Sequence, residues 1–134
     1  MSKQSLTIKG ELPNLNAVIA AAKLHYANYA AVKKQHTYQV FYLAKAQLKP
    51  IRGSITISVY WISKNARVDP DNLSHGIKYI LDGLVMAKII EDDNRSTVRK
   101  IVHHFPEPDK KNPYVKVVLE ELPEWTLCES RFGR

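Results

Sequence analysis

The chain has 134 residues, of which 45% are hydrophobic and 25% charged, and these proportions predict one globular domain rather than a disordered segment. A single cysteine, Cys128, excludes an internal disulfide and favours a reducing compartment; with no membrane-length apolar run and no secretory leader expected, we expect a cytoplasmic protein. The formal net charge of +7 favours a polyanionic partner such as nucleic acid.

The N-terminal part of the chain is expected to form a strand and a long helix. Residues 5–9 alternate between apolar and polar side chains, as a half-buried strand does. Residues 12–16 form a turn that can cap a helix. Residues 17–48 contain neither glycine nor proline and carry apolar side chains at three- and four-residue steps, which predicts a helix. A break near 35–37 would divide this helix into two pieces. Pro50 ends it.

The remaining elements follow in the same way. Residues 51–62 alternate strongly and predict a strand. Residues 69–87 open with a proline in the first turn and carry an apolar stripe at helical spacing, which predicts a helix. Residues 96–105 and 114–122 are expected to be the last two strands. The apolar face of the strand at 51–62 is expected to consist of Ile55, Ile57, Val59 and Trp61.

This order of elements predicts an α+β fold. We expect a single domain with one mixed β-sheet packed with helices, because a sheet with one apolar face has to bury that face against another layer. The domain is expected to span residues 1–122, and residues 123–134 form a C-terminal tail without a clear period.

Acidic residues gather at two places in this basic chain. Asp69 and Asp71 follow a strand and are separated by one proline, and a second group at 91–93 lies between a helix and a strand. Hard divalent cations such as Mg²⁺ bind carboxylate oxygens, and in phosphodiester hydrolysis they generate the attacking hydroxide and stabilise the leaving oxygen. Because a residue before proline is extended, and residues two apart in an extended segment face the same side, we expect the first two carboxylates to converge.

A polar stripe follows Asp71 along the predicted helix. His75, Lys78 and Asp82 recur at steps of four, three and four, which puts Lys78 on the face of Asp71 and roughly 10 Å along the axis. A cation placed there would offset charge that develops on a phosphate. Three ordinary interpretations stay open: helix capping by the aspartates, a solvated acidic turn, and a helical ion pair of Lys78 with Asp82.

Basic residues flank the acidic groups. They fit contacts to DNA backbone phosphates, and they fit equally a role in solubility. The four are Lys64, Arg67, Arg95 and Arg99. The pair His103-His104 is not expected to bind one metal ion, because neighbouring strand residues point to opposite faces.

One part of the chain is similar to a known family. It covers about residues 68–98, under a quarter of the sequence. Its combination of motifs resembles the signature of the RusA family of Holliday junction resolvases, the crossover junction endodeoxyribonucleases. The matching segments are Asp69-Pro70-Asp71-Asn72-Leu73, Lys78-Tyr79-Ile80-Leu81-Asp82-Gly83-Leu84 and Ile90-Glu91-Asp92-Asp93.

The resemblance implies a homodimer that binds four-way DNA junctions and resolves them with paired symmetric nicks, with Mg²⁺ as cofactor. It implies that Asp69, Asp71 and Asp93 hold the metal, with Asp92 as the alternative to Asp93. It also implies a catalytic lysine, and Lys78 takes that place if the match is anchored on Asp82-Gly83-Leu84.

The chain departs from the family pattern at that lysine. The segment 74–77 makes the spacing from Asp71 about three residues longer than the pattern, and a match anchored on Asp71 puts His75 at the lysine position. We prefer Lys78, because the apolar stripe supports the same alignment.

The sequence therefore predicts a magnesium-dependent, structure-specific DNA endonuclease that acts in DNA recombination and repair. The alternative is a non-catalytic branched-DNA-binding protein of the same fold. A metal phosphoesterase with a small substrate is a further alternative, and it would lack the strong salt dependence of DNA binding. Whether the strand at 5–9 pairs within its own subunit or across a dimer stays open.

Overall fold

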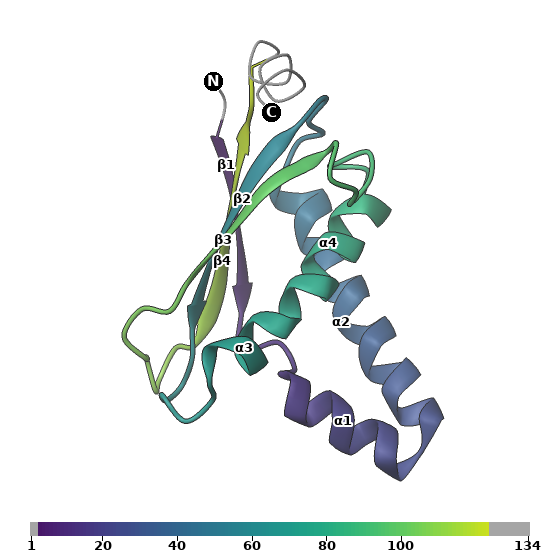
Figure 1. Cartoon of the computed structure of the whole chain (residues 1–134), viewed down its shortest axis with the longest axis vertical. Helices are drawn as coiled ribbons and strands as arrows, with labels where there is room; N and C mark the ends of the chain where they lie inside the picture. The colour runs from purple at the N-terminus through teal and green to yellow at the C-terminus, as the bar shows by residue number, and fades with distance from the viewer. Residues whose placement is uncertain (1–2, 124–134) are drawn as a thin grey trace, which may run out of the picture.

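Helices cover one face of a mixed sheet, and the other face is left open (Figure 1). The computed structural model describes residues 3–123, so most of the predicted tail lies outside the described residues. In chain order the elements are β1 (Lys3–Lys9), α1 (Leu15–Leu24), α2 (Tyr26–Gln47), β2 (Ile55–Ile62), α3 (Pro70–Leu73), a 3₁₀ turn (Ser74–Gly76), α4 (Ile77–Met86), β3 (Val98–His104) and β4 (Tyr114–Glu121). The α+β class with one mixed sheet is confirmed.

The sheet has the strand order β1-β4-β2-β3. Strand β4 is antiparallel to both β1 and β2, whereas β3 runs parallel to β2, with Ile55 opposite Val98 and Tyr60 opposite His104. Strand β1 thus pairs within its own chain, which answers the question left open by the sequence. Because β2 and β3 are parallel, both strands begin at one end of the sheet and finish at the other.

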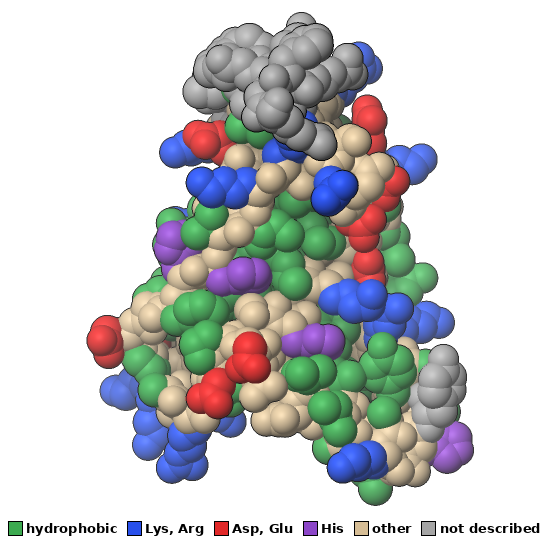
Figure 2. All heavy atoms as spheres, in the orientation of Figure 1, with side chains coloured by type: hydrophobic (Ala, Val, Ile, Leu, Met, Phe, Trp, Pro, Cys, Tyr) green, Lys and Arg blue, Asp and Glu red, His purple; other side chains and the backbone are tan. Residues whose placement is uncertain are grey.

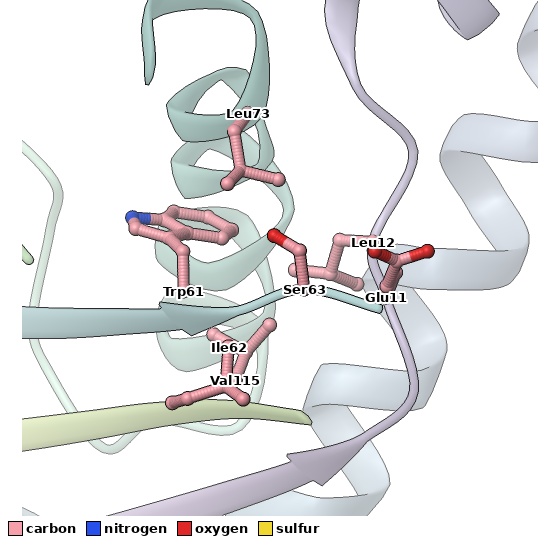
Figure 3. Close-up of a pocket in the computed structure, with 7 residues that line it drawn as sticks. All are labelled: Glu11, Leu12, Trp61, Ile62, Ser63, Leu73 and Val115. Atoms are coloured by element: carbon pink, nitrogen blue, oxygen red, sulfur yellow. The ribbon is translucent and has the colours of Figure 1, made fainter. Parts of the chain in front are cut away.

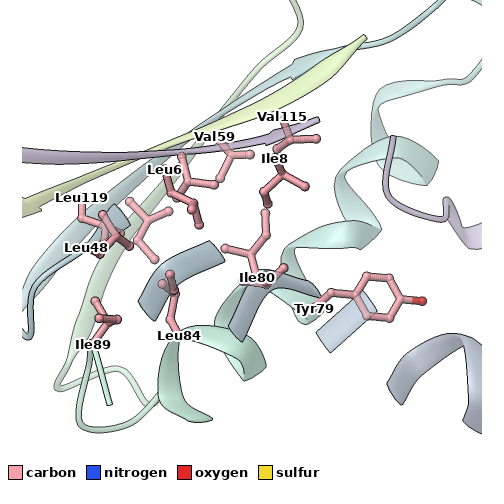
Figure 4. Close-up of a cluster of buried hydrophobic side chains, with 14 of the residues drawn as sticks. Leu6, Ile8, Leu48, Val59, Tyr79, Ile80, Leu84, Ile89, Val115 and Leu119 are labelled. Carbon is pink, nitrogen blue, oxygen red and sulfur yellow. The ribbon is translucent and has the colours of Figure 1, made fainter. Parts of the chain in front are cut away.

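The alternation along β2 matches its burial. Ile55, Ile57, Val59 and Trp61 are at most 2% exposed, as the sequence predicts. They face the helices together with apolar side chains from the neighbouring strands (Figure 4). The strand begins four residues later than predicted, because Gly53 adopts a positive φ of 84° that breaks the extended run before it.

The long helical region is divided at His25, and the predicted break at 35–37 is wrong. The backbone of His25 is extended (φ −166°, ψ 135°), its N–H donates to the carbonyl of Ala21, and its Nδ1 accepts from the N–H of Ala27. One residue therefore ends α1 and caps α2. Helix α1 also begins two residues earlier than predicted, since Asn14 Oδ1 accepts the N–H of Ala17 at 2.9 Å.

The helix predicted for 69–87 is interrupted by the 3₁₀ turn between α3 and α4. Gly76 ends this turn against the sheet, where an added Cβ would lie 3.0 Å from two ring atoms of Trp61. Further along, Gly83 lets α4 approach α2 closely, since a Cβ there would lie 2.6 Å from the Cβ of Val40. Two glycines thus set how the second helical region lies on the rest of the molecule.

The two edges of the sheet differ. At the β1 edge, the side-chain amide of Gln47 accepts the N–H of Thr7 at 3.0 Å and donates to its carbonyl at 3.2 Å. At the β3 edge no further strand is present among residues 3–123, and the side chains of Ile101 and Phe105 are 40% and 43% exposed. Between them His103 accepts the Nε1–H of Trp61 at 2.9 Å, and burial, with a smaller effect of His104, lowers the pKa of His103 below its ordinary value.

The two neighbouring histidines point to opposite faces of β3, as predicted. His103 bonds to Trp61 on the helix side, and His104 stacks on Tyr60 on the open face, with ring centroids 4.2 Å apart. Among residues 3–123, no helix is both long and apolar enough to span a membrane.

Candidate active site

The first acidic group lies at the start of α3. Asp69 is the N-cap residue, with an extended backbone (φ −67°, ψ 153°), and Asp71 lies in the first turn after Pro70. Only Asp69 has an extended backbone, so the expectation that one extended segment presents both carboxylates is wrong. Asp69 precedes the helix and Asp71 lies in its first turn. Both side chains are exposed.

Neither carboxylate caps the helix. Asp69 makes no side-chain capping bond, although it occupies the position where such a bond is common. Within residues 3–123 the side-chain oxygens of Asp69 and Asp71 have no hydrogen-bond donor and no ion-pair partner. The capping hydrogen bond is therefore not formed, although Asp71 lies in the first turn, where a carboxylate complements the helix dipole. The four carboxylate oxygens are open to solvent.

The sheet holds α3 in place through a small pocket (Figure 3). Leu73, the last residue of α3, is buried there against Trp61, and Leu12, Ile62 and Val115 complete the apolar lining. Glu11 lies at the same pocket and accepts the backbone N–H of Lys64 at 3.1 Å, which fixes the loop that leads to Asp69. Sequence reasoning missed Glu11, because its partner lies 53 residues away and no local pattern connects them.

The second acidic group is a hydrogen-bonded turn. The carboxylate of Asp92 accepts the N–H of Asp93 at 2.7 Å and the side-chain amide of Asn94 at 3.1 Å. Asn94 in turn accepts the backbone N–H groups of Ser96 and Thr97. Asp93 is exposed, and within the described chain its carboxylate accepts no bond. Of the two candidates, Asp93 has the free oxygens and Asp92 is engaged in shaping the turn.

The two acidic groups lie at opposite ends of β2. The turn at 91–97 runs beside the start of the strand, since the N–H of Ile51 donates to Ile89 and the N–H of Ile55 donates to Thr97. The start of α3 lies beside the end of the strand, through the contacts of Leu73 and Gly76 with Trp61. Helix α4 connects the two, and its ten residues alone span about 15 Å.

Figure 2 shows acidic side chains over the start of α3 and, well apart from them, others on the right along and beyond α4. Among residues 3–123, no three His, Cys, Asp or Glu side chains form a group that could hold a metal ion. The structure therefore places Asp69 and Asp71 on one helix start, and it does not bring Asp93 to them within one chain.

Lys78 is exposed in the first turn of α4. Its alternative role as the ion-pair partner of Asp82 is not realised, because neither Lys78 nor Asp82 forms an ion pair within the described residues. The 3₁₀ turn is narrower and longer than α-helix, so the rise from Asp71 to Lys78 is roughly 12 Å, which a long lysine side chain directed toward the helix start shortens. His75 is partly buried, and its ring lies nearly perpendicular to that of Tyr79, with the two ring centroids 6.4 Å apart.

The four predicted DNA-contacting residues divide between the two groups. Lys64 and Arg67 lie in the loop before Asp69, and Arg95 and Arg99 lie beside the turn of Asp93. All four are exposed, and none forms an ion pair within the described residues. Each acidic group thus has its own pair of cations nearby.

The sequence matches no protein-family model and no curated protein.

Proposed function

We propose that this protein is a magnesium-dependent endonuclease that resolves four-way DNA junctions by paired symmetric nicks. The observation that carries the proposal is the state of Asp69 and Asp71: two exposed carboxylates at a helix start, with none of their oxygens used for capping or ion pairing in the described chain. The motif similarity to the RusA family points to the same two residues. A cytoplasmic location belongs to the same proposal.

The donor set fits a hard divalent cation, which prefers carboxylate oxygens. Asp69 and Asp71 would supply two ligands, and Asp93, whose oxygens are also free, would supply the third. Bound Mg²⁺ would provide the hydroxide nucleophile and stabilise the leaving oxygen. Lys78 would offset charge on the scissile phosphate, and Lys64, Arg67, Arg95 and Arg99 would hold the junction arms through their backbone phosphates.

The separation of Asp93 from the other two aspartates favours a homodimer. In a two-fold dimer whose axis lies at right angles to α4, the two copies of this helix run antiparallel, so that opposite ends of the two subunits come together. The partner subunit's Asp93 would then complete the site at Asp69 and Asp71. A contact surface for a second copy is suggested by Ile101 and Phe105, exposed on the unpaired edge of β3, and by the hydrophobic side chains gathered between the sheet and α4 (Figure 2).

The test is cleavage of a labelled synthetic four-way junction with Mg²⁺ and with EDTA, using the wild type, Asp71→Asn and a control, Glu107→Gln. The control removes one exposed carboxylate charge outside the proposed site. The proposal expects symmetric nicks that require Mg²⁺, survive in the control and disappear in Asp71→Asn. Cleavage that survives in Asp71→Asn would refute the assigned site.

The second candidate is a branched-DNA-binding protein without catalysis. The three-residue turn that shifts Lys78 along its helix favours it, because a displaced lysine weakens the case for catalysis. Tight junction binding with no nicks in either Mg²⁺ or Mn²⁺ would establish this candidate. Neither binding nor nicking would refute both functions.

A further inference from the structure

The open face of the sheet is polar and carries most of its charge as lysine. Figure 1 shows that the helices lie on the opposite face. The alternation of buried and solvent-facing residues, together with the strand register, identifies the open-face side chains. They are Lys3, Ser5, Thr7 and Lys9 of β1, Tyr114, Lys116, Val118 and Glu120 of β4, Thr56, Ser58, Tyr60 and Ile62 of β2, and Lys100, Val102 and His104 of β3.

Four of these residues lie on one diagonal across all four strands. Lys9 is opposite Tyr114, and Lys116 is opposite Thr7 on one side and Tyr60 on the other. Ser58 is opposite Val118 and Val102, and Lys100 is opposite Thr56. From each member to the next, the diagonal therefore moves one strand across and two residues along. We call the line of Lys9, Lys116, Ser58 and Lys100 the lysine diagonal.

The spacing along the lysine diagonal is regular. Neighbouring strands lie about 4.8 Å apart and two residues of a strand span about 6.6 Å, so each step is about 8 Å and the whole line about 24 Å. Three of its four positions are exposed lysines. Ser58 occupies the remaining position, and a hydroxyl there is a hydrogen-bond donor to an acceptor that follows the line.

The charge of the lysine diagonal is not balanced within the subunit. In the described chain, Lys9, Lys100 and Lys116 have no ion-pair partner. The acidic residue of this face is Glu120, which lies off the diagonal and pairs with Lys3 at 3.5 Å. Beside Lys116, the ring of Tyr60 stacks on that of His104 with an angle of 8° between the planes. The face thus combines a cationic line with aromatic rings next to it.

We propose that the lysine diagonal binds the sugar–phosphate backbone of one DNA arm. A line of unpaired cations across the sheet fits a polymer that carries a row of anionic charges. A second copy of this chain fits poorly, because stacking two such faces would bring lysines against lysines. The choice of DNA as the polyanion rests on the proposed function, whereas the cationic line does not. The lysine diagonal lies on the face of the sheet opposite the helices that carry Asp71 and Lys78. A DNA arm bound there would therefore be separated from the proposed active site by the sheet.

The test compares two triple variants with the same change in charge. Lys9→Ala/Lys100→Ala/Lys116→Ala removes the lysine diagonal, and Lys23→Ala/Lys45→Ala/Lys49→Ala removes three exposed lysines from the helix side. Binding of a fluorescent four-way junction is measured by anisotropy in EDTA at several salt concentrations. Each phosphate contact contributes about 0.9 to the slope of log K against log salt, so the diagonal variant is expected to lose about 2 to 3 from the slope. The helix-side variant is expected to keep the wild-type slope.

Equal slopes in the two triple variants would overturn the proposal. A changed sedimentation coefficient with an unchanged slope would also overturn it, and would make the face an interface between copies. Thermal unfolding checks both variants, and the single variant Lys116→Gln replaces the triple variant if that fails to fold. Because no Mg²⁺ is present, this test is separate from cleavage: a wild type that binds through the diagonal but never nicks would refute the nuclease and retain the binding face.

Discussion

The two acidic regions of this molecule look alike in sequence and differ in structure. At the start of α3, Asp69 and Asp71 have side-chain oxygens without partners in the described chain, although the helix start beside them is an ordinary place for capping. In the turn after α4, Asp92 is engaged by two donors and Asn94 by two more, so the turn is stabilised from within. Only Asp93 in that turn resembles the first region.

Whether an acidic residue can bind a ligand depends on whether its carboxylate oxygens already accept hydrogen bonds within the protein. A carboxylate that already accepts hydrogen bonds is a structural group, whereas one that leaves a nearby helix start uncapped is available for a ligand. By this criterion three of the four candidate aspartates remain. They are distributed between two ends of α4, which makes the partner subunit part of the proposed site.

Mixing two inactive variants tests whether each site combines Asp69 and Asp71 of one subunit with Asp93 of the other. Asp71→Asn and Asp93→Asn are each expected to lose junction cleavage by more than about 100-fold, a loss that even outer partners of metal ligands reach. If each site takes Asp93 from the partner, a mixed dimer has one intact site. After random subunit exchange, roughly a quarter of the wild-type sites would return. The measurement is nicking of a labelled junction, with unpaired nicks expected.

The control for this experiment is a mixture of Asp69→Asn with Asp71→Asn. Both changes lie on the same helix start, so every site in the mixed dimer lacks one ligand under either arrangement. No recovery in the first mixture would place all three carboxylates of each site in one subunit and contradict the proposed dimer.

Lys78 and His75 can be separated by substitution. Lys78→Ala is expected to lower the single-turnover cleavage rate by about 100-fold, as the loss of a group that stabilises transition-state charge does. The Mg²⁺ concentration that gives half-maximal rate should stay unchanged, because a lysine is not a ligand. His75→Ala, whose ring packs on Tyr79, should leave the rate near that of the wild type. A larger loss in His75→Ala would assign it the catalytic role instead.

The helix that separates the two acidic regions depends on Gly83. Gly83→Ala is expected to reduce the free energy of unfolding by about 1–3 kcal/mol, since its Cβ would meet Val40 at 2.6 Å. This loss should exceed the gain in helix propensity of about 1 kcal/mol. Urea denaturation measures it, and the double variant Val40→Ala/Gly83→Ala should be less destabilised than the sum of the single variants. Strict additivity would show that the contact is relieved elsewhere.

The smallest expected effect is a difference in the free energy of unfolding between substitutions of Asp92 and Asp93. Asp92→Ala removes the acceptor of two hydrogen bonds and is expected to lower the free energy of unfolding by about 1 kcal/mol. Asp93→Ala should change it by no more than about 0.5 kcal/mol, as for an exposed side chain without partners. Thermal or urea unfolding compares the two. Equal losses would mean that the turn does not depend on Asp92.

Much of the fold could be predicted because it follows local rules. The alternation along β2 and β4 reflects burial of one sheet face, and that pattern is readable from side chains two residues apart. The break at His25 could not be predicted, since it depends on a histidine nitrogen that replaces the usual capping groups. The 3₁₀ turn depends on Gly76 meeting Trp61, a contact made only in the folded chain.

The candidate residues could be predicted and their arrangement could not. The motif around Asp69 and Asp71 identified a helix start, and that is where they lie. The distance to Asp93 depends on whether β3 runs parallel or antiparallel to β2, because parallel pairing puts the start of β3 at the far end of the sheet. No local pattern in the sequence encodes that choice.

The side chain of Gln47 has a consequence for how this sheet can grow. Its amide offers one donor and one acceptor to the backbone of Thr7, which is what a residue of an added strand would offer. A glutamine on a helix thus acts as a one-residue terminator of the ladder at β1. Recruitment of a further strand, from a second copy or from a misfolded chain, is therefore directed to the β3 edge. Within the described residues, the sheet can therefore add a strand at its β3 edge but not beside Thr7 at its β1 edge.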